Sequence, residues 1–76
     1  MNHETPDLYL SAYVIACGTP LSTSRREGRR VWFGFELESL EAWEDFQRSF
    51  HSGEGQVSGK AMAEAVKAVK SLVSIT

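Results

Sequence analysis

The sequence predicts a small α+β domain in which a two-stranded antiparallel hairpin packs against three helices, in the order α-β-β-α-α. Two patterns carry this prediction. Three segments place apolar residues at helical spacing, and a run with alternating apolar residues, Val31 to Phe35, follows a turn that contains Gly28. The 76 residues leave room for one domain, residues 1–76, with an ordered part over about 5–74.

The first helix is expected to begin at Pro6 and to contain the run over residues 8–17, which is apolar on nearly all sides. Thr5 suits its N-cap, and Pro6 suits the first helical position because its missing N–H needs no partner there. Gly18 suits the residue after the helix, where a left-handed backbone is required. Residues 1–4 are expected to be a frayed tail.

Two registers of the hairpin are open. A two-residue turn at Glu27-Gly28 places Leu21 on the face opposite to Val31 and Phe33, whereas a three-residue loop over 26–28 places these apolar residues together. The three-residue loop is therefore favoured, and it also uses Gly28 where a positive φ is needed. The outer face then carries Arg30, Trp32 and Gly34.

The second helix is expected to begin after Ser39 and to end at Gly53, with a loop over residues 52–55. The third is expected to begin at Ser58, with a loose tail over 74–76. The centre of the core is predicted to hold the following residues: Phe33, Phe35, Trp43, Phe46, Val66 and Val69.

Four of the eight basic residues lie within six positions: Arg25, Arg26, Arg29 and Arg30. Charge runs usually mark solvated faces, and charge at a hairpin tip also prevents pairing of sheet edges. Guanidinium groups nevertheless match phosphate oxygens, and Trp32 on the same outer face as Arg30 offers a stacking surface for a base. The leading hypothesis is a non-enzymatic binding module that contacts nucleic acid phosphates. Four single-strand contacts would give a salt slope of about −3, and hence weak, salt-sensitive binding.

A homodimer or another protein partner is the alternative, as for a phage or mobile-element accessory protein. A core of this size supplies only ~3–5 kcal/mol, so pairing of strand 31–35 or strand 20–25 about a two-fold axis would stabilise it. Trp32 or an exposed part of the first helix would form the contact. The acidic block from Glu36 to Asp45 can also meet a basic protein, although a solvated helix N-terminus is the favoured interpretation.

The sequence shows no catalytic, metal or cofactor motif, so neither an enzyme nor a bound cofactor is expected. Cys17 lies at the end of an apolar helix and is interpreted as a buried small side chain, while His3 lies in the tail and His51 at a helix end. No apolar run is long enough to span a membrane. The single cysteine and the polar N-terminus indicate a cytoplasmic protein.

The chain also resembles a family of small uncharacterised domains seen in bacteria, archaea and their phages. The resemblance covers residues 7 to about 73 and rests on these features: Asp7-Leu8-Tyr9-Leu10-Ser11-Ala12-Tyr13, Gly18, the turn Arg26 to Gly28, the strand Arg30-Val31-Trp32-Phe33-Gly34-Phe35, Phe46 with Phe50, and Lys70-Ser71-Leu72. It implies the helix–hairpin–helix–helix fold and an accessory role, without an activity. The family position of Trp32 holds a smaller or aliphatic residue, so the resemblance implies no role for Trp32.

Overall fold

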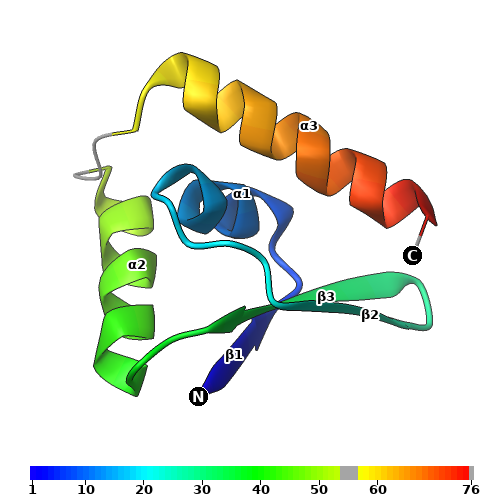
Figure 1. Ribbon diagram of the computed structural model, residues 1–76, viewed down its shortest axis with the longest axis horizontal. Coiled ribbons are helices and arrows are strands. Elements are labelled where there is room, and N and C mark those ends of the chain that lie inside the picture. Colours follow the sequence, from blue (N-terminus) through cyan, green and yellow to red (C-terminus); the bar gives the residue numbers. More distant parts are fainter. Residues whose placement is uncertain (54–56, 76) are drawn as a thin grey trace.

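The computed structural model describes residues 1–53 and 57–75, and it shows a three-stranded antiparallel sheet with helices packed on one face (Figure 1). The predicted α+β class is confirmed, but the order is β-α-β-β-α-α. The elements are β1 (Asn2–Thr5), α1 (Leu8–Ala16), β2 (Thr23–Glu27), β3 (Arg30–Glu36), α2 (Leu40–Ser52) and α3 (Gly59–Ile75).

The N-terminal residues form a strand, so the prediction of a frayed tail is wrong. β1 pairs antiparallel with β3, placing Thr5 opposite Phe33 and His3 opposite Phe35, and the Leu37 N–H donates to the Met1 carbonyl at 2.9 Å. The strand forms because His3 and Thr5 alternate toward the helices, where the His3 ring stacks on Trp43 with 5.7 Å between centroids. β3 becomes the central strand, so a dimer through strand 31–35 would have to displace β1.

Helix α1 is capped by Asp7 rather than by Thr5. The Asp7 carboxylate accepts hydrogen bonds from the N–H groups of Tyr9 and Leu10 at 3.0 and 3.1 Å. Thr5 is buried in β1, and its hydroxyl oxygen accepts from the Asp7 N–H at 3.1 Å. The extra strand thus moves the helix start two residues along the chain.

The end of α1 lies where the sequence predicts it. Gly18 has φ 105°, its N–H donates to the Ile15 carbonyl, and the Thr19 N–H donates to the Val14 carbonyl. This pair of bonds is a Schellman motif. Cys17, expected to be buried, is exposed because the chain leaves the core at this cap.

The hairpin turn is Gly28-Arg29, so both predicted registers are wrong. Glu27 pairs with Arg30, and the turn places Gly28 at φ 63° and Arg29 at a negative φ. This combination of signs is that of a type II′ turn, whose twist matches that of the flanking strands. In this register Arg25 lies opposite Trp32 on the outer face, and Arg26 lies opposite Val31 on the helix face. The outer face carries Arg30, Trp32 and Gly34, as the sequence predicts.

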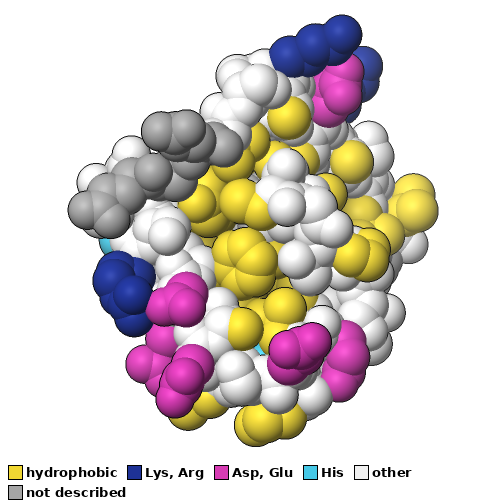
Figure 2. Space-filling view, turned by 60° about the vertical axis from the view of Figure 1, so that its left-hand side comes forward, with side chains coloured by type: hydrophobic (Ala, Val, Ile, Leu, Met, Phe, Trp, Pro, Cys, Tyr) yellow, Lys and Arg dark blue, Asp and Glu magenta, His cyan; other side chains and the backbone are white. Residues whose placement is uncertain are grey.

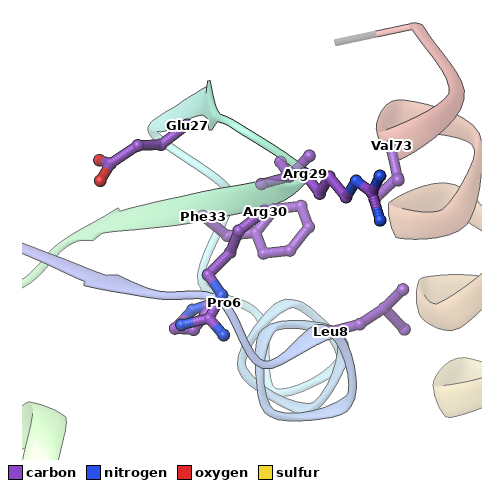
Figure 3. Close-up of a pocket in the computed structure, with 8 residues that line it drawn as sticks. Pro6, Leu8, Glu27, Arg29, Arg30, Phe33 and Val73 are labelled. Atoms are coloured by element: carbon purple, nitrogen blue, oxygen red, sulfur yellow. The ribbon is translucent and has the colours of Figure 1, made fainter.

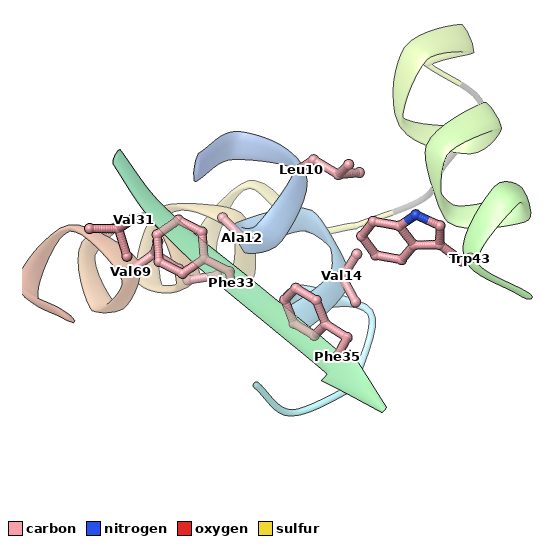
Figure 4. Packing of buried hydrophobic residues seen from close by; sticks show 9 residues of the cluster. Leu10, Ala12, Val14, Val31, Phe33, Phe35, Trp43 and Val69 are labelled. Carbon is pink, nitrogen blue, oxygen red and sulfur yellow. The ribbon is translucent and has the colours of Figure 1, made fainter. Parts of the chain in front are cut away.

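The core lies between the inner face of the sheet and the helices (Figure 4). Phe33 and Phe35 are 1% and 0% exposed, and five consecutive residues of α1 are buried because this helix lies between the sheet and α3. Phe46 and Val66 are only partly buried and pack at the edge of the core instead of its centre. The core residues are Leu10, Ala12, Val14, Val31, Phe33, Phe35, Trp43, Ala65 and Val69.

The other two helices begin at their predicted caps. The hydroxyl groups of Ser39 and Ser58 accept from the N–H groups of Ala42 and Ala61 at 3.2 and 3.0 Å, and Gly53 ends α2 with φ 75°. Helix α3 continues to Ile75, so residues 74–75 are helical and not a loose tail. Residues 54–55 of the predicted loop, and Thr76, lie outside the described residues. In the described chain, no helix has the length and apolarity needed to cross a membrane.

Candidate functional site

The four clustered arginines point in different directions, because residues in a strand alternate between its two faces. Arg25 lies on the outer face of the sheet and Arg26 on the helix face, while Arg29 lies in the turn and Arg30 begins β3. They therefore do not form a single cationic tip.

Two carboxylates hold Arg25 on the outer face. Its Nε donates to Oε2 of Glu4 at 2.9 Å, and its Nη1 donates to Oε2 of Glu27 at 2.6 Å. The hydrogen bond to Glu4, followed by that to Glu27, raises the pKa of Arg25 above its ordinary value. Two negative charges against one positive charge leave this part of the face without an excess of cation.

Trp32 belongs to the same outer cluster. The Arg25 guanidinium carbon lies 5.3 Å from the centroid of the Trp32 ring, a cation–π contact. Arg25 therefore covers one face of this half-buried ring, and the stacking role predicted for Trp32 requires Arg25 to move.

Arg26 ties the hairpin to α3. Its Nη2 donates to the carbonyl oxygen of Val73 at 3.1 Å, within the last turn of that helix. Arginine bonded to terminal carbonyls satisfies acceptors that the helix leaves without an internal partner. The bond holds the end of α3 beside the hairpin.

Arg29 and Arg30 border a groove of about 560 Å³ (Figure 3). Arg29 extends toward Val73 and Arg30 toward Pro6, so that the guanidinium groups lie on different sides of the groove. Both side chains are exposed, and within residues 1–53 and 57–75 neither makes an ion pair or a side-chain hydrogen bond. The apolar lining consists of Pro6, Leu8, Val31, Phe33 and Val73. Glu27 also lines the groove, and its carboxylate accepts from Arg25.

The groove also exposes a short free edge of β3. The bond from Leu37 N–H to Met1 shows that odd-numbered residues of this region direct their peptide groups toward β1, since these groups alternate along an antiparallel strand. β1 ends at Thr5, opposite Phe33, so among the described residues no strand lies beside Val31 on this edge, and its peptide groups point toward the groove. By this alternation the N–H of Val31 is a further donor at the groove that Arg29 and Arg30 border.

The structure brings together only two of the five predicted site residues in a hollow. Arg29 and Arg30 share the groove, Arg25 and Trp32 form the outer cluster, and Arg26 bonds to α3. Sequence reasoning missed Pro6, Leu8 and Val73, which come from segments far apart in the chain and carry no motif.

In the part of the chain that the structure describes, no cluster of three or more His, Cys, Asp or Glu side chains is arranged to hold a metal ion. Comparisons with protein-family models, curated proteins and solved structures found no match. The family resemblance stays a prediction, and function is inferred from the geometry of the groove.

Proposed function

We propose that this protein is a non-enzymatic binding module that holds the sugar–phosphate backbone of single-stranded nucleic acid in the groove of Arg29 and Arg30. The observation that carries the proposal is the presence of two exposed guanidinium groups, without ion-pair partners among the described residues, on two sides of one groove with an apolar floor. The acidic residue that lines this groove, Glu27, is paired with Arg25 instead.

The groove suits a strand better than an isolated anion. Arg29 and Arg30 extend in different directions, so each can meet a different phosphate along one backbone. The apolar floor between them accommodates a sugar or the face of a base, and the Val31 N–H adds a neutral donor. A peptide made only of acidic residues offers carboxylates but no ring that could pack on this apolar floor.

Binding is expected to be weak and sensitive to salt. Each single-strand phosphate contact contributes about −0.7 to the slope of log K against log salt, so two contacts give a slope of about −1.4. The slope of about −3 expected for four arginines no longer applies, because Arg25 and Arg26 are engaged within the protein.

The proposal is tested by fluorescence anisotropy with labelled single-stranded DNA and RNA, a duplex and polyglutamate, between about 50 and about 200 mM salt. The variant Arg29→Gln/Arg30→Gln removes both charges from the groove and is expected to abolish binding. Arg48→Gln/Lys60→Gln removes the same charge from exposed positions on α2 and α3 and is expected to retain most of it.

Equal losses in the two double variants would show diffuse attraction and overturn the proposal. If polyglutamate binds as tightly as the single strands, the ligand of the groove is an acidic protein segment and not nucleic acid. Absence of binding at the lowest salt would leave the two arginines as a solubility feature of the turn.

A further inference from the structure

A second groove, of about 320 Å³, lies between α1 and α2, at the end of the molecule opposite to the hairpin turn. Its lining combines an apolar floor with a few polar groups: Tyr13, Ala42, Asp45, Phe46 and Ser49. Figure 2 shows this side, with hydrophobic side chains gathered in the middle of the face and acidic side chains around its lower part.

The floor is built from aromatic rings. Tyr13 is 8% exposed, and its ring lies 5.6 Å from that of Phe50, centroid to centroid. Burial is the main cause that raises the pKa of Tyr13, and its interaction with Cys17 adds to it, so the phenol is neutral near pH 7. The groove thus combines the rings of Tyr13 and Phe46 with the neutral hydroxyl groups of Tyr13 and Ser49, which interact with each other.

The rim is acidic. Asp45 lines the groove, and Glu41 lies one helical turn before it on the same edge of α2. Among the described residues, the one ion pair at this edge joins Asp45 to Arg48, with 2.9 Å between Oδ1 and Nη1. Glu41 is exposed and makes no ion pair with a described residue, so this edge of the groove keeps an excess of negative charge.

We propose that this groove binds a basic amphipathic segment of a protein partner. An apolar side chain of the segment enters between Tyr13 and Phe46, and its lysine or arginine side chains meet Glu41 and Asp45. The charge of the rim selects this occupant, because it repels nucleic acid and acidic peptides while it attracts cations. This groove shares no lining residue with the groove of Arg29 and Arg30, so the test of one proposal does not decide the other.

The test is a titration of the ¹⁵N-labelled protein with a synthetic amphipathic helix made only of leucine and lysine, followed by NMR. Shifts are expected for the amides around Ala42, Asp45 and Ser49 and not around Arg29 and Arg30. An oligolysine of the same charge is expected to bind more weakly, because it has no apolar side chain for the floor.

Matched variants distinguish the effect of a carboxylate at the groove from the effect of the overall charge of the protein. Glu41→Gln is expected to weaken binding roughly two- to fivefold, the range of one exposed charge pair. Glu64→Gln makes the same change on α3 and is expected to have no such effect. Equal effects, shifts that map elsewhere, or no binding of the peptide would each overturn the proposal. Self-association of the protein alone that Glu41→Gln abolishes would identify a second copy, instead of another protein, as the occupant.

Discussion

Arg25 of β2 donates to Glu4 of β1 across the central strand, with 2.9 Å between Nε and Oε2, although the two residues are 21 positions apart in the chain. Next to this contact lies Gly34, which faces Glu4 in one ladder and Thr23 in the other, and the side chains of Thr23 and Asn2 lie over it. A glycine at this place lets side chains from both edge strands meet over β3. Polar side chains therefore cover this part of the outer face. The carboxylates of Glu4 and Glu27 neutralise the charge of Arg25, which lies over the ring of Trp32.

Removal of the Glu4 carboxylate is therefore expected to strengthen binding of nucleic acid. In Glu4→Gln the Arg25 guanidinium loses one of its two carboxylate partners and keeps Glu27, so its Nε side becomes available to a phosphate, and the ring of Trp32 becomes easier to uncover. The slope of log K against log salt should become more negative by about 0.7, one further contact. Anisotropy titrations measure this. Glu64→Gln carries the same charge change, and an equal slope in both variants would contradict a specific role of Arg25.

Gly34→Ala is expected to destabilise the sheet. An added Cβ would collide with Oγ1 of Thr23 and would lie 3.0 Å from the side-chain amide of Asn2. Thr23 is β-branched and has few alternative rotamers, so the strands must shift at a cost of about 1–3 kcal/mol. Urea unfolding of Gly34→Ala and of Gly34→Ala/Thr23→Ala tests this. The second variant removes the collision and should recover much of the loss, and equal stability of both would show that Thr23 is not the cause.

The sequence contains strong signals for the helix ends and for the central strand. Ser39, Ser58, Gly18 and Gly53 each satisfy backbone groups that a helix end leaves unpaired, so their positions follow from local chemistry. The alternation of apolar residues over 31–35 similarly reflects a strand with one buried face.

β1 has no such signal. It has four residues, and its inward side chains belong to His3, which is half-buried against Trp43, and to Thr5, which is buried. The strand exists through pairing with residues about 30 positions away, which local propensity does not encode.

The site was harder to predict than the fold, because one step of register exchanges the two faces of a strand. The observed turn at Gly28-Arg29 extends β2 to Glu27, so Arg26 lies in the strand, on the helix face, and not in the turn. With Arg25 on the outer face, two arginines remain for the groove. The sequence predicts a solvated helix N-terminus for the acidic block from Glu36 to Asp45. The apolar hollow beside it depends on Tyr13 of α1 and was therefore not visible in the sequence of α2.

Tyr13 is expected to make the protein less stable in alkali. Its pKa is raised by burial and by Cys17, so the folded protein holds this proton more tightly than the unfolded chain does. The contribution is fully present below the ordinary pKa of 10.0 and is lost as the pH rises through the higher pKa of the folded state. Urea midpoints between about pH 8 and about pH 11 should fall less steeply in Tyr13→Phe than in the wild type. Tyr9→Phe alters an exposed tyrosine, and an equally shallow fall in this variant would contradict the assignment to Tyr13.

Substitutions at His3 test whether β1 packs against the domain and contributes to its stability. The His3 ring stacks on Trp43 with an interplanar angle of 9°, and its Nε2 is buried without a hydrogen-bond partner among the described residues. A buried polar atom without a partner costs about 1–3 kcal/mol, and an aromatic pair contributes about 0.5–1.5 kcal/mol beyond the area it buries. His3→Phe keeps the ring and removes the nitrogen, so it is expected to stabilise the fold by about 1 kcal/mol.

His3→Ala instead removes the stack and opens a space beside Trp43, so it is expected to destabilise the fold by about 1–2 kcal/mol. Urea unfolding followed by circular dichroism measures both changes. Stabilities that coincide with that of the wild type in both variants would mean that β1 adds nothing to the fold. Opposite signs for the two substitutions would show that the N-terminal strand stabilises the domain through the ring of His3, and that the imidazole nitrogen of His3 opposes this stabilisation.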